Sequence, residues 1–215
     1  MRSPLSTAAL LAMLVAPLAA QNNDPDKAAP GGGAVPPGWT VRADKGDAKT
    51  AKIVTMGKGL HVTTGPAIIL YRGDTKGSGP FHTLATFTQT KPSEHAEGYG
   101  LLVGGQDLDG PGQKYLYFLV RQDGSYLIKR RDGEKTTDVS KGWVKHEAVK
   151  QPEGQGSSTN LLEVDNKRNP SRVTFLVNGQ EVYGTDAKGM ALDGIVGLRV
   201  NHNLDVHIDG FDVHR

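Results

Sequence analysis

The acidic residues Glu163 and Asp165 form the first pair in this chain whose spacing could support chemistry. Two carboxylates about 5–5.5 Å apart can cleave a glycosidic bond, one as nucleophile and the other as acid and base. Alternation along a strand places these two side chains on one face, about 7 Å apart. Lys167 and Arg168 follow where a third acid would complete the set. Glu163 is therefore a catalytic candidate without its partner, and a polar strand face is the alternative interpretation.

Asp107 and Asp109 form a second acidic pair, directly before Gly110. Carboxylates at this spacing can present oxygens to Ca²⁺, but an EF-hand series would need an oxygen ligand at the next alternate position, which is Pro111. Aspartates before a glycine also bond to the backbone of their own turn. We treat both residues as catalytic candidates and Ca²⁺ binding as an alternative to this turn.

Near the C-terminus, Asp205, His207 and Asp209 alternate and so share one face of a predicted strand. Imidazole and carboxylate together suit Zn²⁺ or another transition metal. The stretch has no H-E-x-x-H motif, and Gly210 predicts a bulge that reorients the residues after it. These three residues are candidate metal ligands, and a solvated face on which acids and histidines pair is the alternative. Our expectation for the whole chain is that it needs no cofactor.

Aromatic side chains gather between residues 99 and 143, and two of them, Tyr115 and Tyr117, share a strand face. Exposed tyrosines can stack on the apolar face of a sugar while polar neighbours hold its hydroxyl groups. The sequence therefore gives a candidate ligand site on a concave sheet, made of Tyr115, Tyr117, Gln106, Arg121 and Lys129. The alternative is that each tyrosine belongs to the core and only its hydroxyl reaches the surface.

Charge and missing motifs exclude several function classes. The formal net charge is +2, and removal of a leader that holds Arg2 leaves 24 of the 25 basic residues against 23 acidic ones. This balance argues against a nucleic-acid partner, which favours a basic stripe. The sequence has no cysteine, no G-x-S-x-G elbow, no P-loop and no dinucleotide fingerprint.

Short apolar runs separated by turn residues predict an all-β fold. The segment 98–131 contains three such runs, closed by Asp109-Gly110-Pro111-Gly112 and Asp123-Gly124, and two of them, Leu101–Val103 and Tyr115–Val120, have the composition of strands buried on both faces. Asn178-Gly179 is a strong hairpin signal. Spaced along the chain, these patterns predict about twelve strands in a two-sheet antiparallel sandwich, with a helical turn only at Ala187–Leu192.

The N-terminus carries the pattern of an export signal. Residues 1–20 contain Arg2, an apolar stretch over Leu5–Leu18 and a small-residue cleavage site. Residues 21–38 are rich in Pro, Gly and polar residues, which predicts a disordered linker before one domain over residues 39–215. With no cysteine for disulfides, we expect a secreted or periplasmic bacterial protein that is not inserted in the membrane once the signal is removed.

Three stretches resemble the concanavalin A-like jelly-roll superfamily: TNLLEVDNKRNPSRVTFLVNGQEV, GIVGLRVNHNLDVHIDGFDVH and the meander EGYGLLVGGQDLDGPGQKYLYFLVRQDGSYLIKRR. The last is similar to secreted bacterial members grouped with the 3-keto-disaccharide hydrolase family and with laminarinase-like and laminin-G-like modules. The resemblance implies a jelly roll over residues 39–215. Laminarinase-type members carry the motif E-x-D-x-x-E or E-x-D-x-E. Glu163-Val164-Asp165 matches the first half of this motif, but Lys167 and Arg168 stand where the second glutamate would be.

Together these observations predict a secreted, non-catalytic module that binds carbohydrate or a related extracellular polymer. One alternative is a hydrolase of a sugar derivative, as the 3-keto-disaccharide resemblance implies. Its acids would come from Asp107, Asp109, Glu163 or the C-terminal stretch. The other alternative is a laminin-G-like module that recognises protein. Ca²⁺ at Asp107 and Asp109, and Zn²⁺ at the C-terminal stretch, are the alternatives to the expectation of no cofactor.

Overall fold

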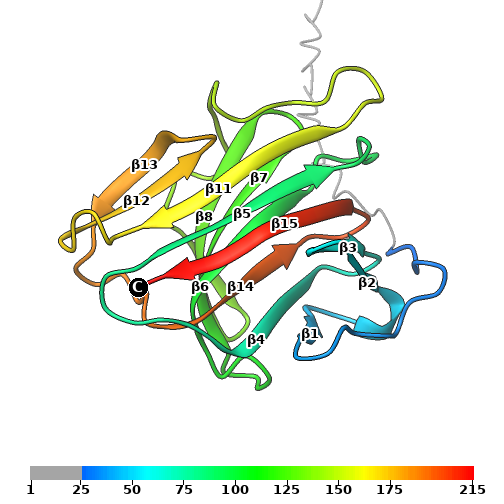
Figure 1. The fold of residues 1–215 in the computed structure, drawn as a ribbon, viewed down its shortest axis with the longest axis horizontal. Coiled ribbons are helices and arrows are strands. Elements are labelled where there is room, and N and C mark those ends of the chain that lie inside the picture. Colours follow the sequence, from blue (N-terminus) through cyan, green and yellow to red (C-terminus); the bar gives the residue numbers. More distant parts are fainter. Residues whose placement is uncertain (1–25) are drawn as a thin grey trace, which may run out of the picture.

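The computed structural model describes residues 26–215, so the predicted export signal lies outside the described residues. The described chain is all-β, with no α-helix and one 3₁₀ turn, η1 (Ala48–Thr50) (Figure 1). Its strands are β1 (Thr40–Ala43), β2 (Lys52–Met56), β3 (Gly59–Thr63), β4 (Ile68–Gly77), β5 (His82–Gln89), β6 (Gly98–Gln106), β7 (Lys114–Arg121), β8 (Ser125–Asp132), β9 (Lys135–Asp138), β10 (Val144–Lys145), β11 (Ser158–Asp165), β12 (Arg172–Val177), β13 (Gln180–Asp186), β14 (Gly194–Val200) and β15 (Asp205–His214).

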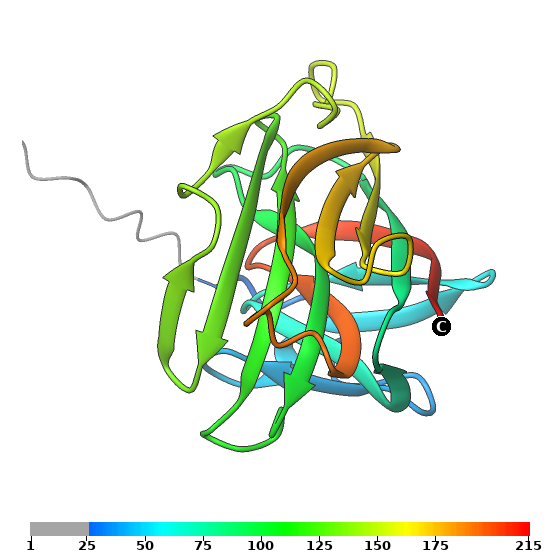
Figure 2. The ribbon, with the colours of Figure 1, turned by 90° about the vertical axis from the view of Figure 1, so that its left-hand side faces the viewer.

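The strands form two antiparallel sheets that face each other. Sheet A has the order β1-β4-β14-β6-β7-β8-β10, with β9 paired to β8, and sheet B has the order β13-β12-β11-β5-β15-β3-β2. Seen from the side, β6, β7 and β8 lie in one layer and β11 lies in the other (Figure 2). The predicted two-sheet antiparallel sandwich is therefore confirmed.

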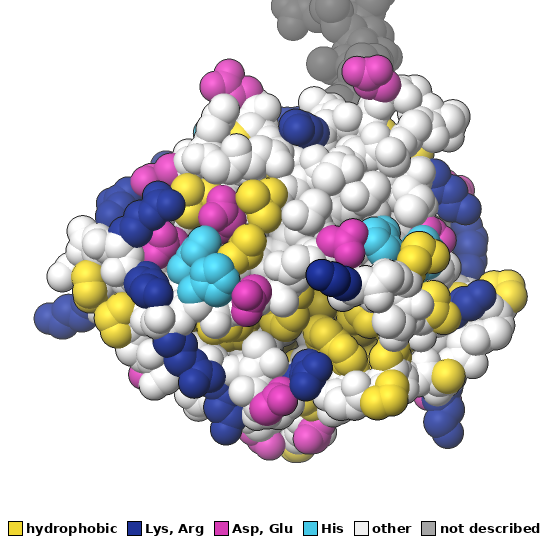
Figure 3. All heavy atoms as spheres, viewed as in Figure 1, with side chains coloured by type: hydrophobic (Ala, Val, Ile, Leu, Met, Phe, Trp, Pro, Cys, Tyr) yellow, Lys and Arg dark blue, Asp and Glu magenta, His cyan; other side chains and the backbone are white. Residues whose placement is uncertain are grey.

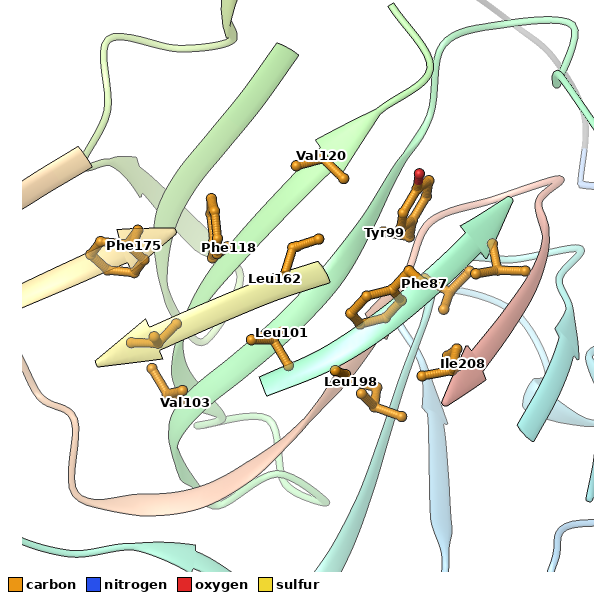
Figure 4. Close-up of a cluster of buried hydrophobic side chains, with 14 of the residues drawn as sticks. Phe87, Tyr99, Leu101, Val103, Phe118, Val120, Leu162, Phe175, Leu198 and Ile208 are labelled. Atoms are coloured by element: carbon orange, nitrogen blue, oxygen red, sulfur yellow. The ribbon is translucent and has the colours of Figure 1, made fainter. Parts of the chain in front are cut away.

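The main core fills the space between the sheets, because alternate residues of each strand point inward. In β5 the side chains of Thr83, Ala85 and Phe87 are fully buried, in the alternation that the sequence predicts. Aromatic rings join the layers: the ring centroids of Phe87 and Tyr99 are 5.7 Å apart, and those of Phe118 and Phe175 are 5.3 Å apart in an edge-to-face contact. Figure 4 shows these side chains pointing toward one another from both sheets.

A second apolar cluster covers the outer face of sheet A. It comprises Ile69, Tyr71, Leu102, Leu108, Tyr115, Tyr117, Leu119 and Leu127, with Trp143 and Ile195 packed against it. Leu108 comes from the β6–β7 loop, and Arg42 holds this loop by donating two hydrogen bonds, to the carbonyl oxygens of Leu108 (2.7 Å) and Gly110 (2.9 Å). This cover explains why β6 and β7 are buried on both faces, as their composition predicts.

Turn residues set the ends of the strands. Asn178 and Gly179 both have positive φ, 52° and 79°, so the β12–β13 hairpin forms at the predicted dipeptide. The Asn178 side chain also accepts from the Leu161 amide at 2.9 Å and donates to the Ala148 carbonyl at 2.7 Å, which ties the turn to the neighbouring strand and loop.

The structure differs from the predicted elements in a few places. The short strands β9 and β10 were not among the predicted strands. β9 consists of four exposed polar residues and β10 of only two residues, so neither shows the alternation of apolar residues that predicts a strand. The predicted helical turn at Ala187–Leu192 is wrong: only one turn hydrogen bond forms there, from the Met190 amide to the Ala187 carbonyl (3.0 Å). Within residues 26–215, no helix has the length and apolar character required to cross a membrane.

The second half of the predicted linker lies against the domain. The Ala29 amide donates to the Thr50 carbonyl at 2.8 Å, and the Gly33 amide donates to the Ala51 carbonyl at 3.2 Å. A Cβ at Gly32 would stand 2.7 Å from the Ala51 carbonyl oxygen, so only glycine allows this approach. The small and turn-forming residues of this segment are the basis on which disorder was predicted. In the structure these same residues allow the backbone to pack closely against the domain.

Candidate functional site

The tyrosines of the predicted sugar platform lie on the outer face of sheet A but are not exposed. Tyr115 and Tyr117 are only 2% and 6% exposed, and their rings contact each other at a centroid distance of 5.7 Å. The Arg199 guanidinium lies 5.0 Å above the Tyr117 ring. The two tyrosines therefore form part of the second apolar cluster, which is the alternative that the sequence left open.

A buried ion-pair network holds these tyrosines in place. Arg199 donates to both Asp44 carboxylate oxygens, at 3.1 and 2.6 Å, and to the Tyr115 hydroxyl at 2.9 Å. Arg131 approaches the same carboxylate at 3.0 Å. Burial alone would raise the pKa of Asp44, but the hydrogen bonds and charges of Arg199 and Arg131 outweigh it and hold that pKa below its ordinary value.

The other three residues of the predicted ligand site separate into different surroundings. Gln106 lines the same cavity of about 200 Å³ as Tyr115, at one end of sheet A. Arg121 lies over the Trp143 ring at 4.3 Å and pairs with Asp123 at 2.8 Å. Lys129 pairs with Asp138 at 3.0 Å. Only Gln106 and Tyr115 therefore share one cavity.

The candidate catalytic acids lie on opposite sides of the sandwich. Asp107 and Asp109 are in the β6–β7 loop of sheet A, where Asp109 accepts a hydrogen bond from the Tyr71 hydroxyl. Burial first, and then this carboxylate, raise the pKa of Tyr71. Glu163 lies on sheet B and bonds to His82 at 2.9 Å. The three acids do not form one site.

The C-terminal acids and histidines form separate pairs. His61 and Asp205 are 3.1 Å apart, and His207 and Asp209 are 2.7 Å apart. In residues 26–215, no group of three or more acidic, histidine or cysteine side chains is arranged to hold a metal ion. Asp205 and His207 are partly buried and Asp209 is exposed, and each of the two acids pairs with a histidine.

A cleft of about 480 Å³ lies between β4 of sheet A and β15 of sheet B. The rings of Trp39 and Phe211 lie in its wall with centroids 5.9 Å apart, and both side chains are partly exposed. Leu198 and Ile208 from the core form its apolar base. Figure 3 shows this hollow as an apolar recess on the face viewed, with charged side chains around it.

Charged and polar groups surround the aromatic wall of this cleft. The lining includes four basic residues and two acidic ones: Lys58, Arg72, Lys76, Arg215, Asp74 and Asp212. Arg72 and Asp74 form an exposed ion pair at 3.1 Å, which leaves both side chains accessible. Ligand sites commonly combine such an apolar, aromatic wall with a few polar groups that set orientation and specificity.

Two features of the chain place Phe211 in the cleft. Gly210 has a φ of 62°, and the pairing of β15 with β5 shifts its register between Asp209 and Asp212. This is the bulge predicted at Gly210. Phe211 packs against the core and is partly exposed to the cleft. The turn before β1 supplies Trp39, whose amide donates to the Pro36 carbonyl at 3.1 Å.

Sequence reasoning missed Trp39 and Phe211 as site residues. Each stands in an apolar pattern that is compatible with the core, and they are far apart in the chain. The one available signal was Gly210, because a bulge redirects the residue after it.

No protein-family model and no curated protein matches the sequence. Solved structures do match in fold. The carbohydrate-binding module CBM66 from Bacillus subtilis has a TM-score of 0.59 at 10% identity, over 83% of this chain and 96% of that one. A protein of unknown function with a galectin-like fold from Bacillus subtilis has a TM-score of 0.56 at 11% identity, over 82% and 88%.

The carbohydrate recognition domain of Emp46p, in its metal-free form, is also similar, with a TM-score of 0.53 at 15% identity over 82% of this chain and 88% of that one. Identities this low establish a shared fold and no more. The described chain therefore has a concanavalin A-like jelly-roll fold, as its resemblance implied. Function depends on sites placed on such a fold.

Proposed function

We propose that this chain is an exported, non-catalytic module that binds carbohydrate in the cleft between β4 and β15. The observation that carries the proposal is the pair of partly exposed rings, Trp39 and Phe211, beside a charged rim in a cavity of about 480 Å³. The similar structures include a carbohydrate-binding module and a carbohydrate recognition domain, which makes this ligand class the first to test.

The physical basis is the two-sided character of a sugar ring. Its C–H face is apolar and stacks on an indole or phenyl ring, while its hydroxyl groups need hydrogen-bond partners when water is removed. Trp39 offers the ring, and Arg72, Asp74 and Lys58 offer donors and acceptors at the rim. The free energy of such stacking comes from buried apolar area together with ring geometry.

The proposal that binding is not followed by catalysis rests on the separation of the acids. None of the three candidate catalytic acids Asp107, Asp109 and Glu163 lines the cleft, and they lie on different sheets, whereas glycosidase chemistry needs two carboxyl groups within about 10 Å across one bond. Export is proposed from residues 1–20, and periplasmic and culture fractions of an expressing cell would test it.

The test of binding compares two tryptophan variants of the chain without its export signal. Affinity electrophoresis against a panel of plant and microbial polysaccharides should show retardation that Trp39→Ala abolishes. Trp143→Ala is the matched control, because Trp143 is also partly buried but lies over Gly98 and Arg121 on the outer face of sheet A. Equal retardation of both variants, or none with any polysaccharide, would contradict the proposal.

A second candidate function, hydrolysis of a 3-keto-glycoside, is favoured by one observation. Glu163 and His82 form a hydrogen-bonded acid–imidazole pair at 2.9 Å, and His82 and His214 line a cavity of about 300 Å³ with ring centroids 5.7 Å apart. A carboxylate that orients an imidazole is a common acid–base arrangement. Turnover of 3-keto-glycosides that Glu163→Gln abolishes, with folding unchanged, would establish this function in place of simple binding.

A further inference from the structure

The wall of the Trp39 cleft contains an ion pair, Arg72–Asp74, whose two groups meet edge to edge. Arg72 Nε donates to Asp74 Oδ1 at 3.2 Å, and Arg72 Nη2 donates to Asp74 Oδ2 at 3.1 Å. Two parallel bonds of this kind fix the guanidinium and the carboxylate relative to each other. Both residues line the cleft, so the pair is a preformed polar unit in its wall.

Trp39 is the neighbour of this ion pair in sheet A. β1 and β4 pair in antiparallel register, with Thr40 opposite Tyr71. The residue directly before β1, Trp39, is therefore at the level of Arg72. A Cβ added to Gly38 would lie 3.7 Å from Arg72 Cζ, so the guanidinium lies close to the backbone that carries the Trp39 ring. The aromatic ring and the ion pair thus belong to one part of the cleft.

The ion pair keeps hydrogen-bonding capacity for a ligand. A guanidinium has five N–H donors, and among residues 26–215 Arg72 uses only those of Nε and Nη2 that bond to Asp74. In the same residues, Asp74 Oδ2 accepts only from Arg72, although a carboxylate oxygen can accept two bonds. The two side chains are 42% and 70% exposed, so the pair contributes little to folding and is accessible to a ligand.

The charges of Arg72 and Asp74 cancel, so the pair favours a neutral ligand that needs both a donor and an acceptor. Hydrogen bonds from Arg72 hold the pKa of Asp74 below its ordinary value, which keeps the carboxylate charged. Two hydroxyl groups on neighbouring carbons of a sugar ring meet this need, because one can accept from Arg72 Nη2 and the other can donate to Asp74 Oδ2, 3.1 Å away. Hydrogen bonds to charged groups are stronger than those between neutral groups.

The second ring of the cleft does not extend the surface of Trp39 into one flat platform. The rings of Trp39 and Phe211 are tilted by 42° with their centroids 5.9 Å apart, so a flat sugar ring cannot stack on both. The Arg72–Asp74 pair lies next to Trp39. This arrangement can orient one sugar ring, with its C–H face on Trp39 and the hydroxyl groups at its edge on the ion pair.

We propose that the Arg72–Asp74 pair determines the specificity of the cleft. It selects a neutral saccharide with two free hydroxyl groups on neighbouring carbons of the ring that stacks on Trp39. The inference rests on the proposed function, because it takes the ligand of the cleft to be a carbohydrate. It adds the chemical class of that carbohydrate and the two residues that recognise it.

The test is affinity electrophoresis of the chain without its export signal in gels that contain dextran, mannan or polygalacturonate, with the two neutral polymers also in O-methylated form. Methylation keeps the sugar ring and its C–H face but removes the hydroxyl protons. A native neutral polymer should bind about tenfold more tightly than its methylated form. Asp74→Ala and Arg72→Ala should each weaken binding of the native polymer about tenfold and leave binding of the methylated polymer unchanged, because the lost bonds need free hydroxyl groups.

Glu181→Ala is the matched control. It removes the acid of another exposed ion pair, formed with Arg172, and neither residue of that pair lines the cleft. Its binding should equal that of wild type, and unchanged melting temperatures should show that all three variants fold. A loss of binding in Glu181→Ala as large as that in Asp74→Ala would overturn the inference.

The Trp39→Ala variant separates this inference from the proposed function. If Trp39→Ala abolishes binding while Asp74→Ala and Arg72→Ala bind as wild type does, the cleft binds carbohydrate and the specificity given to the ion pair is wrong. Tighter binding of polygalacturonate than of either neutral polymer, lost at high salt, would overturn the neutral ligand class. Binding of no polymer would overturn both proposals.

Discussion

Asp44 joins two arginines at the outer face of sheet A. Its carboxylate meets Arg199, whose side chain is only 7% exposed, and Arg131 as well. A buried guanidinium without a counter-charge lowers the stability of the folded protein. The main effect of Asp44 is therefore to neutralise the charge of Arg199, and the attraction between the two groups contributes less. This one carboxylate also fixes the Arg199 group that holds Tyr115.

Replacing Asp44 by Ala should destabilise the protein by about 3–5 kcal/mol, because Arg199 would then be buried without a counter-charge. Urea unfolding would measure the loss. The double variant Asp44→Ala with Arg199→Met should recover much of it, since no buried charge remains. A double variant as unstable as the single one would show that Asp44 acts through something other than this ion pair.

The same ion pair predicts a dependence on pH. The pKa of Asp44 is lower in the folded protein than its ordinary value of 3.8, so the folded state binds fewer protons than the unfolded state in this range. Its contribution is therefore complete above about pH 5 and falls as the pH drops through the folded-state pKa. The difference in unfolding free energy between wild type and Asp44→Ala should shrink below that pH; a constant difference would contradict the assignment.

Among the elements, β15 links the core to the Trp39 cleft. Leu204, Val206 and Ile208 point into the core, and all three are at most 2% exposed. The bulge at Gly210 then reorients the strand, so that Phe211 borders the cleft. A single positive φ thus separates the structural part of this strand from the part that we propose binds ligand.

Gly210→Ala should cost about 1–2 kcal/mol, because its φ of 62° is unfavourable for a residue with a Cβ. No atom lies within 4 Å of the Cβ position, so the cost is conformational and not a clash. Gly73→Ala is the matched control, since it has equally open space without a positive φ. Thermal unfolding should separate the two variants. Equal melting temperatures would contradict the role given to the bulge.

For the whole molecule, the segment 26–38 belongs to the folded unit more than its composition suggests. It forms backbone hydrogen bonds with Thr50 and Ala51, and Pro36 and Pro37 help to line the cleft. The sandwich therefore begins to gain contacts before its first strand.

A chain that starts at Trp39 should melt a few degrees below one that starts at Asp26, because each lost hydrogen bond contributes about 1 kcal/mol, and 1 kcal/mol shifts a domain of this size by about 2–4 °C. The shorter chain should also bind saccharide more weakly, since it lacks one wall of the cleft. Identical melting temperatures would restore the prediction of an independent linker over these residues.

Most of the architecture could be predicted from local patterns. Alternation in β5, the Asn178-Gly179 hairpin and the Gly210 bulge are decided by neighbouring residues, and all three are confirmed. The strands β9 and β10 could not be found, because β9 is wholly polar, β10 has only two residues, and both pair only where β8 offers a free edge.

The candidate sites were predicted less well than the fold. Tyr115 and Tyr117 alternate correctly along β7, but alternation says only which face of a sheet a side chain is on. Both were placed on the right face and predicted to be accessible, whereas Arg199 lies over the Tyr117 ring and bonds to the Tyr115 hydroxyl. Arg199 comes from β14, far along the chain, so no local pattern reports this contact.

The amino-acid sequence by itself determined the strand periods, the turns and the face on which each side chain lies, because these depend on residues within a few positions of one another. The tertiary structure alone decided which faces are covered and which residues meet. Trp39 and Phe211 are far apart in the chain and meet only because the turn before β1 lies beside the bulged part of β15. Tyr115 and Arg199 meet only because β7 and β14 belong to the same sheet.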